Sequence, residues 1–115
     1  MKLKTHFLLL FLFSIISCTN YVGNHSEISD CLEEKIKEIE IEAPCPDVSV
    51  SQYIFQGKMV YTFDPGTCGA DMTSNALDEN CISIGFLGGL IGNTTVNGED
   101  FSKAIFVKTI WKKSK

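Results

Sequence analysis

Cysteine is the residue type in this chain with the widest choice of chemistry. Four cysteines stand at Cys31, Cys45, Cys68 and Cys81, and four thiols can form two disulfides or hold a zinc ion. Zinc sites usually contain cysteine pairs two to four residues apart, whereas these cysteines follow one another at spacings of 14, 23 and 13 residues. The pattern therefore favours disulfides over a metal site.

Other side chains offer little for catalysis. No histidine follows His25, and a serine or cysteine nucleophile needs an adjacent base. The glycine-rich segment 85–92 lacks the Lys-Ser/Thr pair of a phosphate loop. Four acids gather in one region and could pair as acid and base or hold calcium, but they lack EF-hand spacing; they are Asp64, Asp71, Asp78 and Glu79. We therefore predict no catalytic residue, no metal site and no cofactor.

The N-terminus has the features of an export signal. Lys2 and Lys4 precede an apolar run from Phe7 to Ser17 that is too short to span a bilayer. The sequence Ile15-Ile16-Ser17-Cys18 resembles the bacterial lipobox, which implies cleavage before Cys18 and acylation of its thiol. The alternative is ordinary signal-peptide cleavage with no lipid. Acylation would remove the odd cysteine of five and leave an even set for disulfides.

These features divide the chain into a signal peptide (1–17), a lipid-anchored tether (18–29) and one α+β domain (30–115). Removal of the signal leaves 98 of the 115 residues, with eight lysines, no arginine and 14 acids, hence a net charge of −6. Nucleic-acid binding relies on clustered basic residues, so we predict no nucleic-acid partner. A domain of this size buries a marginal core, and disulfides would offset the shortfall.

A helix is predicted from about residue 31 to 42. Asp30 and Glu33 suit a capping box, and Leu32, Ile36 and Ile39 form one apolar stripe. Pro44 ends the helix. The remaining acids of the helix, Glu34, Glu38, Glu40 and Glu42, fit either a solvated face or a surface that binds something basic.

Alternation of period two then predicts a hairpin around Gln56-Gly57. This turn pairs Ile54 with Met59 and Val50 with Phe63, which places the apolar side chains, except Tyr53, Val60 and Phe55, on the face toward the helix. Asp64-Pro65-Gly66 ends the second strand.

The segment 67–80 is predicted to be a loop, because glycine, aspartate, asparagine and serine dominate it. Further strands are predicted at 81–86 and 104–111, with an Asn97-Gly98 hairpin between them. The fold class is therefore α+β: an N-terminal helix on a small antiparallel sheet of three to five strands, stapled by disulfides.

Helix geometry restricts the disulfide pairing. Cys31 and Cys45 stand at opposite ends of the predicted helix, about 15 to 20 Å apart at 1.5 Å per residue, whereas a disulfide needs Cα atoms within about 7 Å. We therefore expect each of them to bridge to Cys68 or Cys81, with both combinations open.

Several of these residues together resemble a known family. The resemblance covers about residues 30 to 89 and rests on Cys31-Leu-Glu-Glu-Lys-Ile-Lys-Glu-Ile, Val50-x-x-Tyr53-x-Phe55-x-Gly57-Lys-x-Val60-Tyr61-x-Phe63-x-Pro65-x-x-Cys68 and Leu77-Asp-Glu-Asn-Cys81. This order is similar to small bacterial lipoproteins with an uncharacterised domain. The resemblance implies the architecture and an envelope location, and it assigns no activity.

The sequence thus predicts a non-enzymatic, lipid-anchored interaction module. Its expected partners are the membrane, through the lipid on Cys18, and an unidentified protein that contacts the predicted loop. The candidate contact residues are Asp71, Asn75, Asp78 and Glu79. Thr19 follows the cysteine where inner-membrane lipoproteins carry aspartate, which favours the outer membrane of a Gram-negative cell. The alternatives are an inhibitor or immunity-type lipoprotein that blocks an exported enzyme or receptor, and a hydrolase that uses loop carboxylates.

Overall fold

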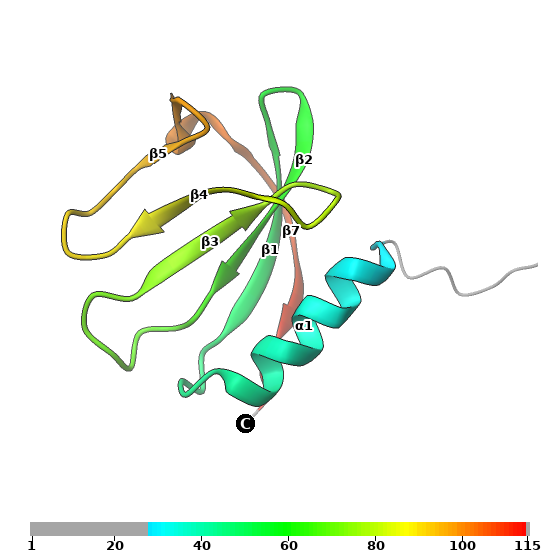
Figure 1. The fold of residues 1–115 in the computed structure, drawn as a ribbon, viewed down its shortest axis with the longest axis vertical. Helices are drawn as coiled ribbons and strands as arrows, with labels where there is room; N and C mark the ends of the chain where they lie inside the picture. The colour runs from blue at the N-terminus through cyan, green and yellow to red at the C-terminus, as the bar shows by residue number, and fades with distance from the viewer. Residues whose placement is uncertain (1–27, 115) are drawn as a thin grey trace, which may run out of the picture.

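The computed structural model describes residues 28–114. The predicted signal peptide, Cys18 and nearly all of the predicted tether therefore lie outside the described residues. Within 28–114, one helix packs on a five-stranded antiparallel sheet (Figure 1). The predicted fold class is confirmed.

Helix α1 spans Asp30–Glu42. The backbone amides of Leu32 and Glu33 donate to the Ser29 carbonyl at 3.0 and 3.1 Å, so the helix starts one residue earlier than expected. Ser29 is the N-cap and makes no side-chain capping bond. The predicted capping box of Asp30 and Glu33 is therefore wrong, because Asp30 is already helical.

Strands β1 (Ser49–Phe55) and β2 (Lys58–Asp64) form the predicted hairpin. Their register pairs Ile54 with Met59 and Val50 with Phe63, as expected. Gln56 and Gly57 both adopt positive φ angles, 53° and 73°, which a two-residue hairpin turn of type I′ requires.

Strands β3 (Thr73–Leu77) and β4 (Ser83–Gly88) extend the sheet beyond β2, and β7 (Ile105–Lys112) returns to pair with β1. The strand order is β4-β3-β2-β1-β7. The prediction of a single loop over 67–80 is therefore wrong, because residues 73–77 are a strand between β2 and β4. Three polar residues begin this strand, so it lacks the apolar alternation that marks a strand in sequence.

A small hairpin connects β4 to β7. It consists of β5 (Thr95–Val96) and β6 (Glu99–Asp100), and a 3-10 helix, η1 (Phe101–Lys103), follows. Asn97 and Gly98 form its turn with φ angles of 47° and 79°, which confirms the Asn-Gly prediction.

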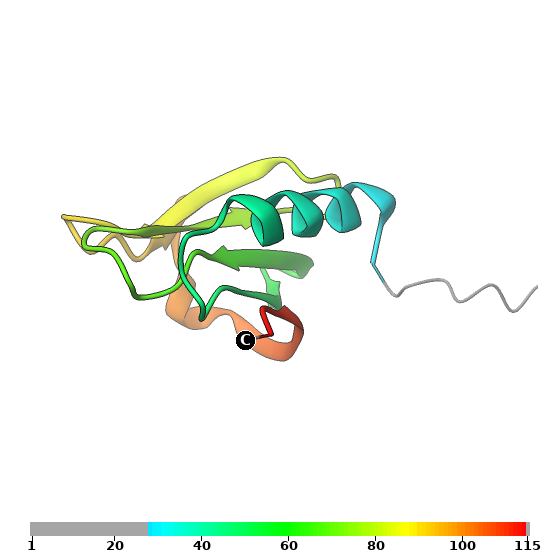
Figure 2. The ribbon, with the colours of Figure 1, turned by 90° about the horizontal axis from the view of Figure 1, so that it is seen from below.

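Two clusters of buried side chains lie on opposite faces of the sheet. Helix α1 covers one face (Figure 2), where the buried residues are Leu32, Ile36, Val50, Tyr61, Phe63 and Leu77. The β5–β6 hairpin and η1 cover the other, where Val96 of β5 is buried together with Phe55, Val60 and Ala76 of the sheet. Residues that alternate along β2 thus serve two cores, which is why Val60, Tyr61, Thr62 and Phe63 are all buried, whereas buried residues are interrupted along β1.

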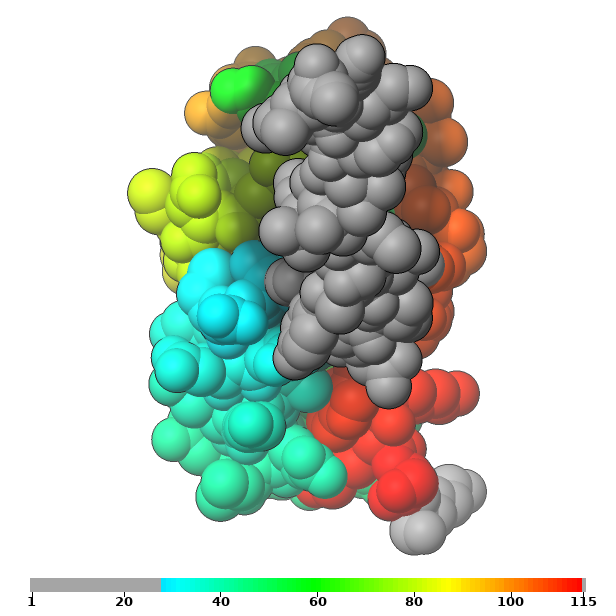
Figure 3. Space-filling view, turned by 90° about the vertical axis from the view of Figure 1, so that its right-hand side faces the viewer, coloured from blue at the N-terminus to red at the C-terminus, as the bar shows by residue number. Residues whose placement is uncertain are grey.

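Each disulfide connects the region of one end of α1 to a loop between strands of the sheet. Cys31 pairs with Cys81 with Cα atoms 6.2 Å apart, and Cys45 pairs with Cys68 at 5.4 Å. The expectation that each helix-end cysteine bridges to Cys68 or Cys81 is confirmed. At the C-terminal end of the helix, Lys113 Nζ also donates to the Ala43 carbonyl at 3.1 Å, so the end of β7 lies against that of α1 (Figure 3).

Candidate functional site

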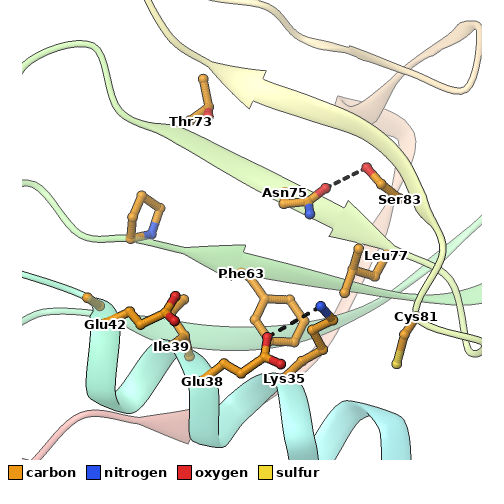
Figure 4. Close-up of a pocket in the computed structure, with 12 residues that line it drawn as sticks. Lys35, Glu38, Ile39, Glu42, Phe63, Thr73, Asn75, Leu77, Cys81 and Ser83 are labelled. Atoms are coloured by element: carbon orange, nitrogen blue, oxygen red, sulfur yellow. Dashed lines mark hydrogen bonds and ion pairs between the residues drawn. The ribbon is translucent and has the colours of Figure 1, made fainter.

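A groove runs between helix α1 and strand β3. Its volume is about 480 Å³, within the range of about 300 to 1,000 Å³ typical of ligand sites. Figure 4 shows the side chains that line it, from α1 on one wall and from β2 to β4 on the other. The lining residues are Lys35, Glu38, Ile39, Glu42, Ala43, Phe63, Pro65, Thr73, Asn75, Leu77, Cys81 and Ser83.

The floor of the groove is apolar. Phe63 pairs with Asn75 across β2 and β3, and Tyr61 pairs with Leu77, so side chains of these positions share the face toward α1. Phe63 and Leu77 are buried there, and Ile39 packs against them from the helix. An apolar floor gives a ligand hydrophobic contact area without any rearrangement of the protein.

The sheet wall presents an oriented amide. Ser83 Oγ donates to Asn75 Oδ1 at 2.6 Å, and this bond places Nδ2 of Asn75 on the groove side (Figure 4). Nδ2 has no hydrogen-bond acceptor among residues 28–114. Two N–H donors are therefore available to a ligand in the groove.

The helix wall is charged. Lys35 Nζ and Glu38 Oε2 form an ion pair of 3.3 Å, with side chains 47% and 58% exposed. Glu42, one turn further along the helix, makes no ion pair with any residue that the structure describes. The groove thus combines an apolar floor, two amide N–H donors and an uncompensated carboxylate.

Of the four predicted contact residues, only Asn75 lines the groove. Asp78 Oδ1 accepts the backbone amides of Asn80 and Ile82 at 2.9 and 3.0 Å and so shapes the β3–β4 turn. The Glu79 carbonyl accepts from Ser29 Oγ at 3.4 Å. Asp71 adopts a φ of 61° in the turn before β3. The strand separates Asp71 from Asp78, so the predicted contact set does not form one surface.

The loop carboxylates do not converge either. Asp64 Oδ1 accepts the Gly66 amide at 2.9 Å within its own turn. Across residues 28–114, no three side chains of His, Cys, Asp or Glu form a group that could hold a metal ion.

The groove itself has no signature in the sequence. Glu38 and Glu42 were open to interpretation as a binding surface, and their spacing of four residues places them on one helix face. Lys35, Phe63 and Thr73 carried no functional signal, because they become neighbours only when α1 packs on the sheet.

A second exposed surface is the tip of the loop between β4 and β5. Leu90 and Ile91 are 84% and 89% exposed, although turns usually carry polar residues. Gly88 and Asn93 exchange two backbone hydrogen bonds of 2.8 and 3.0 Å, and Gly92 N donates to the Gly89 carbonyl at 3.1 Å. The loop is therefore held in a defined shape with its two aliphatic side chains in solvent.

No helix within residues 28–114 has both the length and the apolar character needed to cross a membrane. A family model described as a domain of unknown function, DUF6970, matches residues 36–113. The match runs from the middle of α1 to the end of β7 and contains every groove residue except Lys35. No curated protein and no solved structure matches the chain.

Proposed function

Because the chain belongs to the DUF6970 family, a domain of unknown function, we propose a function from its own residues. The protein is an exported, lipid-anchored module that does not catalyse a reaction and binds a partner in the groove between α1 and β3. The observation that carries this proposal is the groove, because its apolar floor and free polar groups form a ready binding site.

Export and anchoring are proposed from the N-terminal residues. The basic start, the short apolar run and Cys18 fit a lipoprotein signal. The two disulfides support an oxidising compartment outside the cytoplasm. Thr19 after the cysteine supports the outer membrane of a Gram-negative cell over the inner membrane.

Replacement of Cys18 tests the anchor. We expect the protein to fractionate with membranes, and Cys18→Ser to block lipidation and release it or leave it unprocessed. Normal processing and membrane retention of Cys18→Ser would overturn the anchoring proposal.

A binding role fits the described residues better than catalysis. The carboxylates of Asp64 and Asp78 each accept hydrogen bonds from backbone amides of their own turn. They therefore do not form a pair of acid and base around one substrate. The groove offers hydrogen-bonding, charged and apolar groups to a ligand, but among its lining residues no nucleophile lies in contact with a base.

Site-specific photo-crosslinking in the cell tests the groove as the contact surface. Thr73 is exposed and lines the groove, whereas Lys58 is exposed at the start of β2, next to the β1–β2 turn, and does not line it. A crosslinking residue at Thr73 is expected to give one dominant protein adduct, and the same residue at Lys58 to give none. No adduct at Thr73, or the same adduct from both positions, would contradict the proposal.

The β4–β5 loop favours a second candidate function, an inhibitor or immunity-type lipoprotein. Inhibitors commonly insert a preformed loop into the site that they block, and the exposed tip at Leu90 and Ile91 has this form. A crosslinking residue at Leu90 decides between the two candidates. An adduct from Leu90 and none from Thr73 would favour the inhibitor.

A further inference from the structure

We propose that the groove recognises an extended basic segment of a partner protein, about four residues long, with a lysine or arginine directed at the α1 wall. This inference rests on the proposed function, because it takes the groove to be the binding site. It adds the chemical class of the ligand. The argument combines the length of the groove, its charge and its hydrogen-bonding groups.

The length of the groove fits an extended peptide. Lys35 and Ala43 mark its ends on α1, and a helix rises about 1.5 Å per residue, so this wall is about 12 Å long. Thr73 and Leu77 mark its ends on β3, and a strand rises about 3.3 Å per residue, so this wall is about 13 Å long. Both walls therefore match about four residues of extended chain.

The charge of the helix wall selects a cation. Helix α1 has six acids and two lysines in its sequence DCLEEKIKEIEIE. Two of the acids, Glu38 and Glu42, line the groove, and Lys35 pairs with Glu38 alone. A basic side chain beside Glu42 would complete the charge pairing, whereas a phosphate or a carboxylate ligand would meet like charge.

The sheet wall selects a peptide over a simple cation. The free N–H donors of Asn75 face the groove and can donate to a backbone carbonyl of the ligand. Phe63, Leu77 and Ile39 form an apolar floor below. An extended peptide presents alternate side chains to opposite sides, so apolar and basic residues in alternation would meet the floor and the helix wall at once.

Three capped tetrapeptides test the ligand class against the protein purified from the cells that make it, with its N-terminus as processed there. The first alternates leucine with lysine, the second leucine with glutamate, and the third serine with lysine. We expect the leucine-lysine peptide to bind with amide NMR shifts concentrated at α1 and β3. The other two peptides are expected to bind at least about tenfold more weakly, a difference of about 1.4 kcal/mol.

Matched charge variants distinguish binding in the groove from non-specific attraction between the acidic helix and a basic peptide. Glu38→Gln with Glu42→Gln removes two charges inside the groove, and Glu34→Gln with Glu40→Gln removes two charges from the same helix outside it. All four side chains are exposed, so neither pair should alter stability by much. We expect the first pair to weaken binding about tenfold and the second less than about threefold, because exposed charges at a distance are screened.

Equal losses from both pairs, or tight binding of the leucine-glutamate peptide, would overturn the proposal. So would the absence of binding by the leucine-lysine peptide. If that peptide fails while the crosslinker at Thr73 still captures a partner, the ligand class is wrong and the proposed function stands. If both fail, the proposed function falls as well.

Discussion

Ser83 on β4 donates a hydrogen bond of 2.6 Å to Asn75 on β3. The two residues are diagonal neighbours, since Asn75 pairs with Phe86 and Leu77 with Ser83 in the ladder. The bond occupies the amide oxygen of Asn75 and leaves its nitrogen toward the groove. Ser83 on β4 thus determines which group of Asn75 on β3 faces the groove.

Ser83→Ala is therefore expected to affect both stability and ligand binding. Loss of an exposed hydrogen bond should lower the free energy of unfolding by about 0.5 to 1 kcal/mol. The substitution should also weaken binding of the leucine-lysine peptide several-fold, because the Asn75 amide becomes free to rotate. Urea denaturation and peptide titration measure the two effects. Ser74→Ala is the matched control on β3, since Ser74 makes no side-chain hydrogen bond within residues 28–114. Equal effects of Ser83→Ala and Ser74→Ala on stability and peptide binding would contradict the role of Ser83.

Leu32 anchors α1 to the sheet. Its side chain is 1% exposed within the cluster of Val50, Tyr61 and Phe63. Leu32→Ala should lower the free energy of unfolding by about 2 to 5 kcal/mol, because it removes buried methyl groups and leaves a cavity. Ile41→Ala on the same helix should change it by less than about 0.5 kcal/mol, since Ile41 is 84% exposed. Chemical denaturation of both variants checks the orientation of the helix, and similar losses would show that the helix is packed differently.

The two disulfides close loops of different length, with sequence separations of 50 and 23 residues. In the chain-entropy model each stabilises the fold by about 3 to 4 kcal/mol, and the longer loop exceeds the shorter by less than about 1 kcal/mol. We expect removal of either disulfide to lower the denaturation midpoint substantially. One double variant combines Cys31→Ser with Cys81→Ser, and the other combines Cys45→Ser with Cys68→Ser. A variant pair that unfolds at the same denaturant concentration as the parent would show that its disulfide is dispensable.

Asp47 should make the fold sensitive to acid. Its carboxylate accepts a hydrogen bond of 2.6 Å from Thr67 Oγ1 and further bonds from the Thr67 amide, and these bonds hold the pKa of Asp47 below its ordinary value of 3.8. A lowered pKa in the folded state gives stability that is present above pH 3.8 and is lost as the pH falls through the folded pKa. Hydrogen bonds from Gln56 and Ser102 also lower the pKa of Glu99 and of Asp100.

Thermal denaturation between pH 7 and pH 2.5 measures this loss. The loss of stability at low pH should be smaller in Asp47→Asn, because the variant has no carboxylate to protonate at this position. Asp71→Asn serves as a control, since the Asp71 side chain accepts no hydrogen bond within residues 28–114. Identical acid profiles for the parent and Asp47→Asn would contradict the contribution of the Thr67 contacts.

Local patterns predicted the parts of the fold that local forces determine. The stripe of Leu32, Ile36 and Ile39 identified α1, and alternation around Gln56-Gly57 identified β1 and β2 with their register. Strand β3 escaped prediction, because Thr73, Ser74 and Asn75 form a strand only through their pairing with β2 and β4.

The candidate site was harder to predict for the same reason. Asn75 was identified as a contact residue, but it was placed in a loop with Asp71 and Asp78. Its partners in the groove, Glu42 and Phe63, come from elements that meet it only through tertiary packing. The disulfide pairing also depends on how the helix lies on the sheet. The length of the helix excludes a bond between Cys31 and Cys45, but it does not determine which of them pairs with Cys68 and which with Cys81.

The mass of the intact protein, extracted from membranes without reduction, reports both the proposed lipid anchor and the two disulfides in one measurement. We expect a chain that begins at Cys18 and carries acyl groups, with a mass about 4 Da below that of the fully reduced chain, because two disulfides remove four hydrogens. A chain with no acyl groups would contradict the lipid anchor, and one whose cysteines are all reduced would contradict the two disulfides.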